Sequence, residues 1–306
     1  MSRRIFKITP RLYDKIWGGY KLAEYGKGDG ERIGESWELS LTDGCEATLD
    51  GVPLSEALTR EELGKNCERF EFFPVLTKFI DAADKLSVQV HPSDDYALAN
   101  EGQYGKSEMW YVVAAEEGAG LYIGLSREVS PTEFRALVEE GRAEEILDFK
   151  PVSAGDVYFI PSGTIHAIGG GVLIFEIQQN STLTYRIYDY MRLGDDGKPR
   201  ELHLEKAMKV SHLKPYEAPP RDEFCPESIG SCDYFQTRKY KVKFTKTTLY
   251  AKESSFVSVT CVSGSGEIEG MPLSLGDTYF VTAGYGEFSV SGDCEILAVS
   301  VPNEKH

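Results

Sequence analysis

The sequence predicts a mainly β protein built from two tandem β-sandwich domains, the first of which carries helical insertions. Most of the 306 residues fall in short runs of β-branched and aromatic side chains that end at Gly, Pro, Asp or Ser, which is typical of antiparallel sandwiches. Helical periodicity is confined to a few short segments, and one β motif occurs twice. The chain is also longer than most single hydrophobic cores, so we expect two domains.

The predicted strands follow one another along the chain. Within 238–245, Tyr240, Val242 and Phe244 alternate with three lysines, so this strand is expected to bury one face and expose the other. The clearest strand-like runs are 86–91, 108–114, 120–124, 156–160, 172–178, 183–189, 238–245, 255–262, 278–282 and 286–291.

Helices are expected at a few places only. The segment SPTE at 130–133 combines a Ser cap, a Pro at the first helical position and a Glu at the third, which predicts a helix over about 131–140. Residues 54–63 and 142–148 are further candidates. The prolines of 214–228 predict a linker, so the expected domains are 1–220 and 221–306.

One nine-residue motif occurs twice. The segment GDVYFIPSG at 155–163 recurs as GDTYFVTAG at 276–284, which indicates two copies of one β unit. Three residues after the closing glycine, the first copy has His166 and the second has Glu287. We therefore expect a metal site in the first domain and none in the second.

Composition excludes several classes of partner. A formal charge of −16 disfavours nucleic acid and anionic membranes, because the summed field repels both. A small anionic substrate stays possible if local Lys or Arg residues override this background. No export signal and no membrane-spanning run is present, so a cytoplasmic location is expected, and the six cysteines are expected to be buried, reduced thiols.

Ligand-type side chains gather on the strands of the first domain. Gln89 and His91 lie two apart and therefore project from the same face of a strand. Glu108 opens the strand EMWYVV, and His166 follows the turn PSGT. Two imidazoles, a carboxylate and an amide oxygen suit Zn²⁺ first, with Fe²⁺, Mn²⁺ or Co²⁺ also possible. The absence of thiolates favours a catalytic over a structural site.

These motifs resemble a known family. VQVHP, GKSEMWY and PSGTIHAI, in this order, are similar to the metal-binding strands of type I mannose-6-phosphate isomerases, which are zinc-dependent cupins. IWGG, GESWELS and EIQQNSTLTYRIYDY extend the similarity from about Trp17 to Val301, closest to the shorter bacterial branch. The resemblance implies tandem cupin domains, that is, jelly-roll β-sandwiches.

The resemblance also implies a ligand set. In the family, a Gln, two His and a Glu bind zinc, and these correspond here to Gln89, His91, Glu108 and His166, with one ion per chain. Some members use only the last three of these residues. Other divalent metals are possible on the same ligands.

Further site residues follow from the same resemblance. The family's essential arginine corresponds to Arg186, and the lysine two residues before the zinc-binding Glu corresponds to Lys106. Both are expected to be catalytic and to bind substrate. Glu176 is a candidate proton carrier, or else the structural partner of Arg186. Trp17 could line the sugar pocket, although core packing is the alternative. Family members often carry an acidic residue where this chain has Thr182.

The implied activity is the interconversion of mannose 6-phosphate and fructose 6-phosphate through an enediol. Lys106, Glu176 and a metal-bound water all remain candidates for the base. Two alternatives stay open: a non-haem Fe(II) oxygenase, which uses a similar His and carboxylate set, and a non-catalytic sugar-phosphate-binding cupin. The expected partner is a phosphorylated hexose, and the chain is expected to be a monomer or homodimer.

Overall fold

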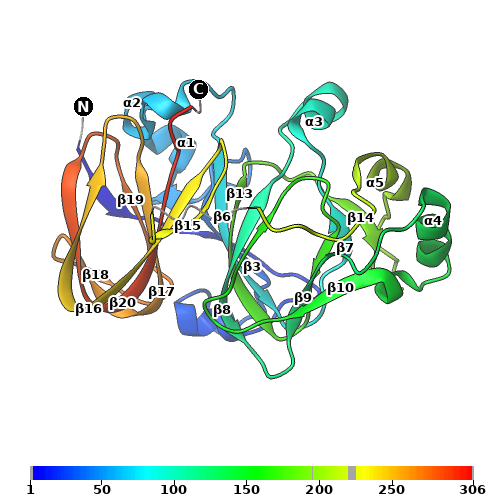
Figure 1. Cartoon of the computed structure of the whole chain (residues 1–306). Helices are drawn as coiled ribbons and strands as arrows, with labels where there is room; N and C mark the ends of the chain where they lie inside the picture. The colour runs from blue at the N-terminus through cyan, green and yellow to red at the C-terminus, as the bar shows by residue number, and fades with distance from the viewer. Residues whose placement is uncertain (1–2, 195, 220–224, 305–306) are drawn as a thin grey trace. The chain divides into compact units, whose positions relative to one another are not determined.

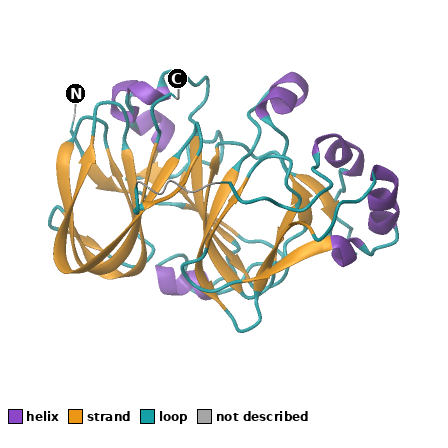
Figure 2. Cartoon of the chain, viewed as in Figure 1, coloured by secondary structure: helices purple, strands orange, loops and turns teal. Residues whose placement is uncertain are grey.

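Strands dominate the computed structural model, which describes residues 3–194, 196–219 and 225–304 (Figure 2). The helices are short and lie between strands, so the predicted mainly β class is confirmed. Within these described ranges, no helix is both long enough and apolar enough to cross a membrane.

The chain forms two compact units. Unit 1 consists of Met1–Tyr13, Lys21–Phe79 and Pro220–His306, and unit 2 of Asp14–Tyr20 and Ile80–Pro219. Every candidate site residue lies in unit 2. One boundary thus falls at Pro220, while the N-terminal segments are grouped with the C-terminal strands, and the division into domains 1–220 and 221–306 stays a prediction.

Unit 2 contains two antiparallel sheets (Figure 1). The first has the strand order β10-β9-β12-β7-β14, and the second has β11-β8-β13, followed by β6. The strands of the first sheet are β7 (Val88–Val90), β9 (Gly120–Leu125), β10 (Leu147–Pro151), β12 (His166–Ile168) and β14 (Tyr185–Tyr188). Those of the second are β8 (Glu108–Ala115), β11 (Val157–Ile160), β13 (Val172–Gln179) and the end of β6 (Val75–Ala82), whose residues up to Phe79 belong to unit 1.

The helices of unit 2 agree only in part with the prediction. Helix α4 (Pro131–Glu139) is confirmed, and the Ser130 side chain caps it by accepting a hydrogen bond from Glu133 N–H at 3.2 Å. The expected helix over 142–148 is wrong: a 3₁₀ turn η3 (Ala143–Ile146) leads directly into β10.

Two helices of unit 2 were not predicted, α3 (Asp94–Glu101) and α5 (Leu204–Val210). Each buries a single alanine, Ala97 in α3 and Ala207 in α5. In α3 the apolar side chains form no marked stripe, so its sequence gives little helical periodicity, whereas α5 has Leu204, Ala207 and Met208 at helical spacing against the core, a signal that could have indicated it.

Alternation along the strands of the first sheet decides which side chains point toward the second sheet and which point toward the helices. Val88 and Val90 belong to a core cluster that also contains Phe134 of α4 and Ala207 of α5. They therefore face the helices, and Gln89 between them faces the second sheet. The same alternation applies on β12 and β14.

Unit 1 is built around a sheet with the order β1-β19-β17-β20-β16-β15, in which β18 also pairs with β17. Its other strands are β2 and β3, which pair with each other and continue to β6, and the separate pair β4–β5. The strands are β1 (Ile5–Lys7), β2 (Arg11–Tyr13), β3 (Glu35–Leu39), β4 (Thr48–Leu49), β5 (Val52–Pro53), β15 (Ser228–Ser231), β16 (Gln236–Ala251), β17 (Val257–Ile268), β18 (Met271–Leu273), β19 (Thr278–Val281) and β20 (Gly286–Ser300).

The short helices of unit 1 correct another expectation. The predicted helix over 54–63 is two helices, α1 (Leu54–Ala57) and α2 (Arg60–Leu63), because Thr59 caps the second one. The remaining turns are the 3₁₀ segments η1 (Lys21–Tyr25) and η2 (Lys65–Cys67).

Two sequence expectations for the C-terminal strands can be checked. Val242 is buried as expected, but Phe244 is 86% exposed. A register shift between Lys243 and Thr245 puts Phe244 at φ 51°, so the simple alternation ends there and the prediction for Phe244 was wrong. The expectation for the cysteines is met only in part: all six are free, but Cys261 and Cys294 alone are buried, and the other four are partly exposed.

A buried ion pair ties the N-terminal and C-terminal segments of unit 1 together. Lys27, 5% exposed, donates hydrogen bonds to Glu38 Oε2 at 2.9 Å and to Gly276 O at 2.8 Å. The Glu38 carboxylate also accepts from Ser36 Oγ at 2.6 Å and from Thr278 Oγ1 at 2.9 Å. These partners compensate the cost of burying both charges.

Replacing Lys27 with Met should lower the free energy of unfolding by about 3 to 5 kcal/mol, because Glu38 would be left as an uncompensated buried charge. The control is Lys65→Met, which breaks the exposed pair between Lys65 and Glu253 at 3.1 Å. Urea denaturation measures both variants. A Lys27→Met midpoint equal to that of Lys65→Met would contradict the prediction.

Candidate metal centre

Three buried ligand-type side chains meet between the two sheets of unit 2. His91 follows β7, His166 begins β12 and Glu108 begins β8. One potential ligand atom from each lies within 4.8 Å of the others, and their exposed fractions are 1%, 1% and 0%. The structure therefore brings together three of the four residues that the sequence proposes as metal ligands, in an arrangement that could hold a metal ion.

Backbone carbonyls orient both imidazoles. The His91 Nδ1–H donates to Leu183 O at 2.7 Å, and the His166 Nδ1–H donates to Thr164 O at 2.9 Å. This leaves Nε2 of each ring as the basic nitrogen. These nitrogens lie 3.6 Å and 3.3 Å from the Glu108 carboxylate oxygens. Two imidazole lone pairs and a carboxylate converge, which is a donor set that suits zinc.

The protonation state of His166 also favours metal binding. Complete burial, together with the positive charge of Lys106, lowers the pKa of His166 from 6.5 to about 4. The ring is therefore neutral at pH 7, and its Nε2 lone pair is available without prior loss of a proton.

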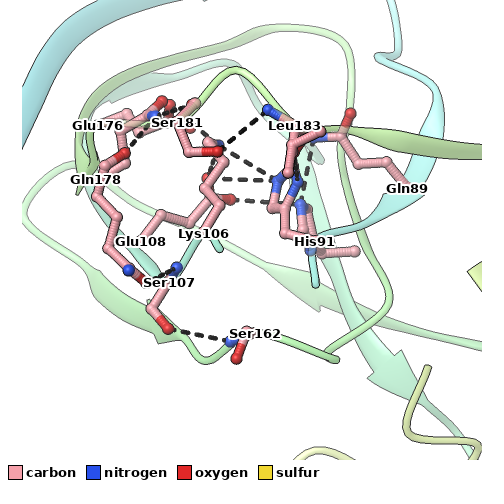
Figure 3. Close-up of polar contacts among 12 residues, drawn as sticks. Gln89, His91, Lys106, Ser107, Glu108, Ser162, Glu176, Gln178, Ser181 and Leu183 are labelled. Atoms are coloured by element: carbon pink, nitrogen blue, oxygen red, sulfur yellow. Dashed lines mark hydrogen bonds and ion pairs between the residues drawn. The ribbon is translucent and has the colours of Figure 1, made fainter. Parts of the chain in front are cut away.

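Lys106 lies among the same ligand atoms (Figure 3). Its ammonium group contacts the Glu108 carboxylate, His91 Nε2 at 3.2 Å and Glu176 Oε1 at 3.5 Å. The side chain is only 5% exposed. Two carboxylates and one ammonium contribute a formal charge of −1, to which the neutral His166 ring adds nothing, and this favours a bound cation. Because Lys106 contacts the same Glu108 and His91 atoms, an incoming ion would compete with it.

Glu176 is fixed on the neighbouring strand. It lies opposite Trp110 in the pairing of β13 with β8, and Trp110 Nε1–H donates to its Oε2 at 2.9 Å. The Trp110 ring also lies edge-on to His166, with centroids 5.3 Å apart. Glu176 contacts Lys106 and Trp110, whereas Arg186 contacts other groups, so the expectation of an Arg186–Glu176 pair is not met.

Gln178 supports the orientation of His91 and was not singled out as a site residue by the sequence. Fully buried opposite Glu108, it donates to Gln179 O and Ser181 O, each at 2.8 Å. These bonds fix the turn that presents the Leu183 carbonyl to His91. Only the strand alternation through Glu176 could have indicated Gln178.

Gln89 lies at the edge of the cluster. It is opposite His166 on one side and Arg186 on the other, so the three side chains share a sheet face. Its amide nitrogen is 3.2 Å from His166 Nε2. To act as a ligand, Gln89 must present its amide oxygen instead, which requires half a turn of the amide. Its role as a ligand stays a prediction.

Arg186 carries the remaining predicted charge of the site. The half-buried guanidinium donates from Nε to Ser87 Oγ at 3.3 Å and from Nη1 to Glu201 O at 2.8 Å. It forms no ion pair within the part of the chain that the structure describes. Trp17, by contrast, is 4% exposed and packs in the same hydrophobic cluster as Trp110, so a contact with substrate there stays a prediction.

Comparisons with known proteins agree with this geometry. Residues 5–117 match the family described as phosphomannose isomerase type I, catalytic domain, and residues 228–301 match mannose-6-phosphate isomerase, cupin domain. The mannose-6-phosphate isomerase of Streptococcus mutans is 37% identical over 97% of this chain and 98% of its own length. The chain belongs to the type I phosphomannose isomerase family. The resemblance inferred from the motifs is confirmed.

Solved structures share the fold. The mannose 6-phosphate isomerase from Bacillus subtilis has a TM-score of 0.85 at 32% identity and covers 97% of this chain and 99% of its own. A mannose 6-phosphate isomerase bound with zinc and yttrium has a TM-score of 0.78 at 16% identity, covering 98% of this chain and 100% of its own. Together with the cupin-domain match, these structures confirm the predicted fold class.

Acidification should destabilise the metal-free protein through His166. Between its unfolded pKa of 6.5 and its folded pKa of about 4, the unfolded chain binds a proton that the native ring does not. Stability is therefore lost as pH falls through this window, by on the order of 3 kcal/mol. Urea denaturation of chelated protein from pH 7 to pH 4 measures it. In His166→Gln the free energy of unfolding should fall less steeply with decreasing pH. Parallel curves of stability against pH for this variant and the wild type would contradict the prediction.

Proposed function

We propose that this protein is a zinc-dependent isomerase that interconverts mannose 6-phosphate and fructose 6-phosphate. The observation that carries the proposal is the buried convergence of two imidazoles, of which His166 is neutral, and a carboxylate, beside a lysine and an arginine, in a chain of this family. We also propose a cytoplasmic location and a monomer or homodimer. Family membership disfavours the oxygenase alternative, and the binding-only role is supported by Thr182, which stands where family members often carry an acidic residue.

In this proposal His91, Glu108 and His166 hold the ion, with the amide oxygen of Gln89 as a possible fourth ligand. Zinc bound there would supply a Lewis acid that stabilises negative charge developing on the sugar oxygens at C1 and C2. Other divalent ions could use the same ligands. The carbonyls that accept from Nδ1 of both imidazoles keep the ligand atoms oriented.

Lys106 and Glu176 are the proposed proton carriers. The reaction removes a proton from C2 of open-chain mannose 6-phosphate and delivers one to C1, while a hydroxyl proton moves from O2 to O1. The Lys106 ammonium is 3.5 Å from Glu176 Oε1, so a proton can pass between them and leave a neutral amine as the base. Burial at 5% and 3% exposure keeps bulk water from these groups.

Arg186 is the proposed clamp for an anionic part of the substrate. Its Nε and Nη1 donate to the protein, and Nη2 makes no hydrogen bond to the described residues. The planar guanidinium can thus direct a donor at a phosphate or enediolate oxygen.

A coupled assay for fructose 6-phosphate formed from mannose 6-phosphate tests the function. Turnover should disappear on chelation and return with zinc. His91→Ala should abolish turnover while the protein stays folded, because a ligand is lost. Glu287→Gln is the matched control: Glu287 follows the second copy of the repeat, is exposed and only accepts from Tyr250 OH at 3.0 Å. Absence of turnover under every metal loading would refute the isomerase, and oxygen uptake would then support the oxygenase.

Replacing Arg186 with Lys should lower kcat/KM by about a hundred-fold or more although the charge is kept. A lysine offers a point charge and cannot reproduce the planar fork that holds Ser87, Glu201 and the substrate together. Steady-state kinetics of the zinc-loaded variant measure this. A kcat/KM close to that of the wild type would remove Arg186 from the site.

A further inference from the structure

Arg186 is held by a segment that returns alongside its own strand. After β14 the chain comes back as residues 200–203, which we call the return segment. The His203 N–H donates to Arg186 O at 2.7 Å, and the Arg186 N–H donates to His203 Nδ1 at 3.2 Å. The Arg186 Nη1 donates to Glu201 O at 2.8 Å. The return segment therefore fixes both the backbone and the guanidinium of Arg186.

Asp189 anchors this segment. Only 5% exposed, its carboxylate accepts two hydrogen bonds from Arg200, from Nε at 2.7 Å and Nη2 at 2.6 Å, and one from Arg192 at 2.8 Å. Burial alone would raise the pKa of Asp189, but the hydrogen bonds from the two arginines hold it below its usual value. A two-bond contact between an arginine and a carboxylate fixes geometry as well as charge.

We propose that Asp189 and Arg200 are positioning residues that hold the Arg186 guanidinium in the orientation that binds the anionic part of the substrate. This inference rests on the proposed function. The path of contacts runs from the Asp189 carboxylate to Arg200, along the backbone to the carbonyl of Glu201, and from there to Arg186 Nη1.

The geometry explains why such an anchor matters. Arg186 uses Nε and Nη1 on protein acceptors, so the direction of Nη2 is set by the positions of Ser87 Oγ and Glu201 O. If the return segment moves, the guanidinium turns with it. A displacement of about 1 Å in a substrate-binding group can cost up to a hundred-fold in rate.

The test begins with Asp189→Asn, which keeps the shape of the side chain and removes its charge. The kcat/KM of the zinc-loaded variant should fall by about ten- to a hundred-fold, with an unchanged zinc content. Arg200→Lys keeps the charge but loses the bidentate contact with Asp189, so its kcat/KM should also fall. It also keeps the proposal testable if Asp189→Asn fails to fold.

The matched control is Asp84→Asn. Asp84 is the other carboxylate that contacts Arg192, at 3.1 Å, but its side chain is 67% exposed and has no contact with the return segment among the described residues. Its removal should change kcat/KM by less than about two-fold, since surface substitutions have small effects.

A double-mutant cycle separates positioning from general structural damage. If Asp189 acts through Arg186, adding Asp189→Asn to Arg186→Lys should lower kcat/KM no further. A readout that needs no turnover is the NMR signal of the Arg186 Nε–H, which is assigned by its absence in Arg186→Lys. Asp189→Asn should shift or broaden this signal, while Asp84→Asn should not.

These experiments distinguish the positioning role of Asp189 and Arg200 from the proposed function. An inactive wild type under every metal loading would refute the proposed function, while the Nε–H signal would still report on positioning. Wild-type kcat/KM in both Asp189→Asn and Arg200→Lys would overturn the positioning role. An Nε–H signal that Asp189→Asn leaves unchanged would also overturn it. The same holds if Asp189→Asn lowers kcat/KM by the same factor in the Arg186→Lys background as in the wild type.

Discussion

A carboxylate buried at zero exposure constrains everything around it in unit 2. Glu108 cannot lie between two sheets without compensating charge, because transfer of an ionised group from water costs several kcal/mol. Lys106 supplies that charge in the metal-free cluster, and a divalent ion would supply it in the proposed enzyme. The facing sheets then have to present basic nitrogens toward this carboxylate, which the carbonyls of Leu183 and Thr164 ensure by accepting hydrogen bonds from the Nδ1–H groups.

Much of this arrangement could be predicted because strands obey a simple rule. A period of two places Gln89 inward between Val88 and Val90, and it places Glu108 and Glu176 on the inward faces of paired strands. The motifs around His91 and His166 added the family, which the comparisons confirm. The fold class and the residues that form the cluster could thus be predicted from the sequence.

What could not be predicted depends on contacts across long loops or on the absence of a pattern. Asp189 and Arg200 are ordinary loop charges until the chain turns back and places them 2.7 Å apart. Helix α3 has no marked apolar stripe, so its sequence gives no clear helical period. At Phe244 a local shift of register breaks the alternation itself. In each case the local sequence pattern does not show how the folded chain places these residues.

The net charge of −16 raises the question of how such a chain would bind a phosphorylated sugar. In unit 2 the carboxylates fix the cations as well as neutralise them: Glu108 contacts Lys106, and Asp189 contacts Arg192 and Arg200. Among the described residues Arg186 is held by neutral oxygens instead, so no ion pair neutralises its charge. One unit charge at 4 Å contributes about 4 kcal/mol at an effective dielectric constant of roughly 20, which exceeds the screened repulsion of distant surface acids. By this comparison the local placement of Arg186 outweighs the overall charge of the chain.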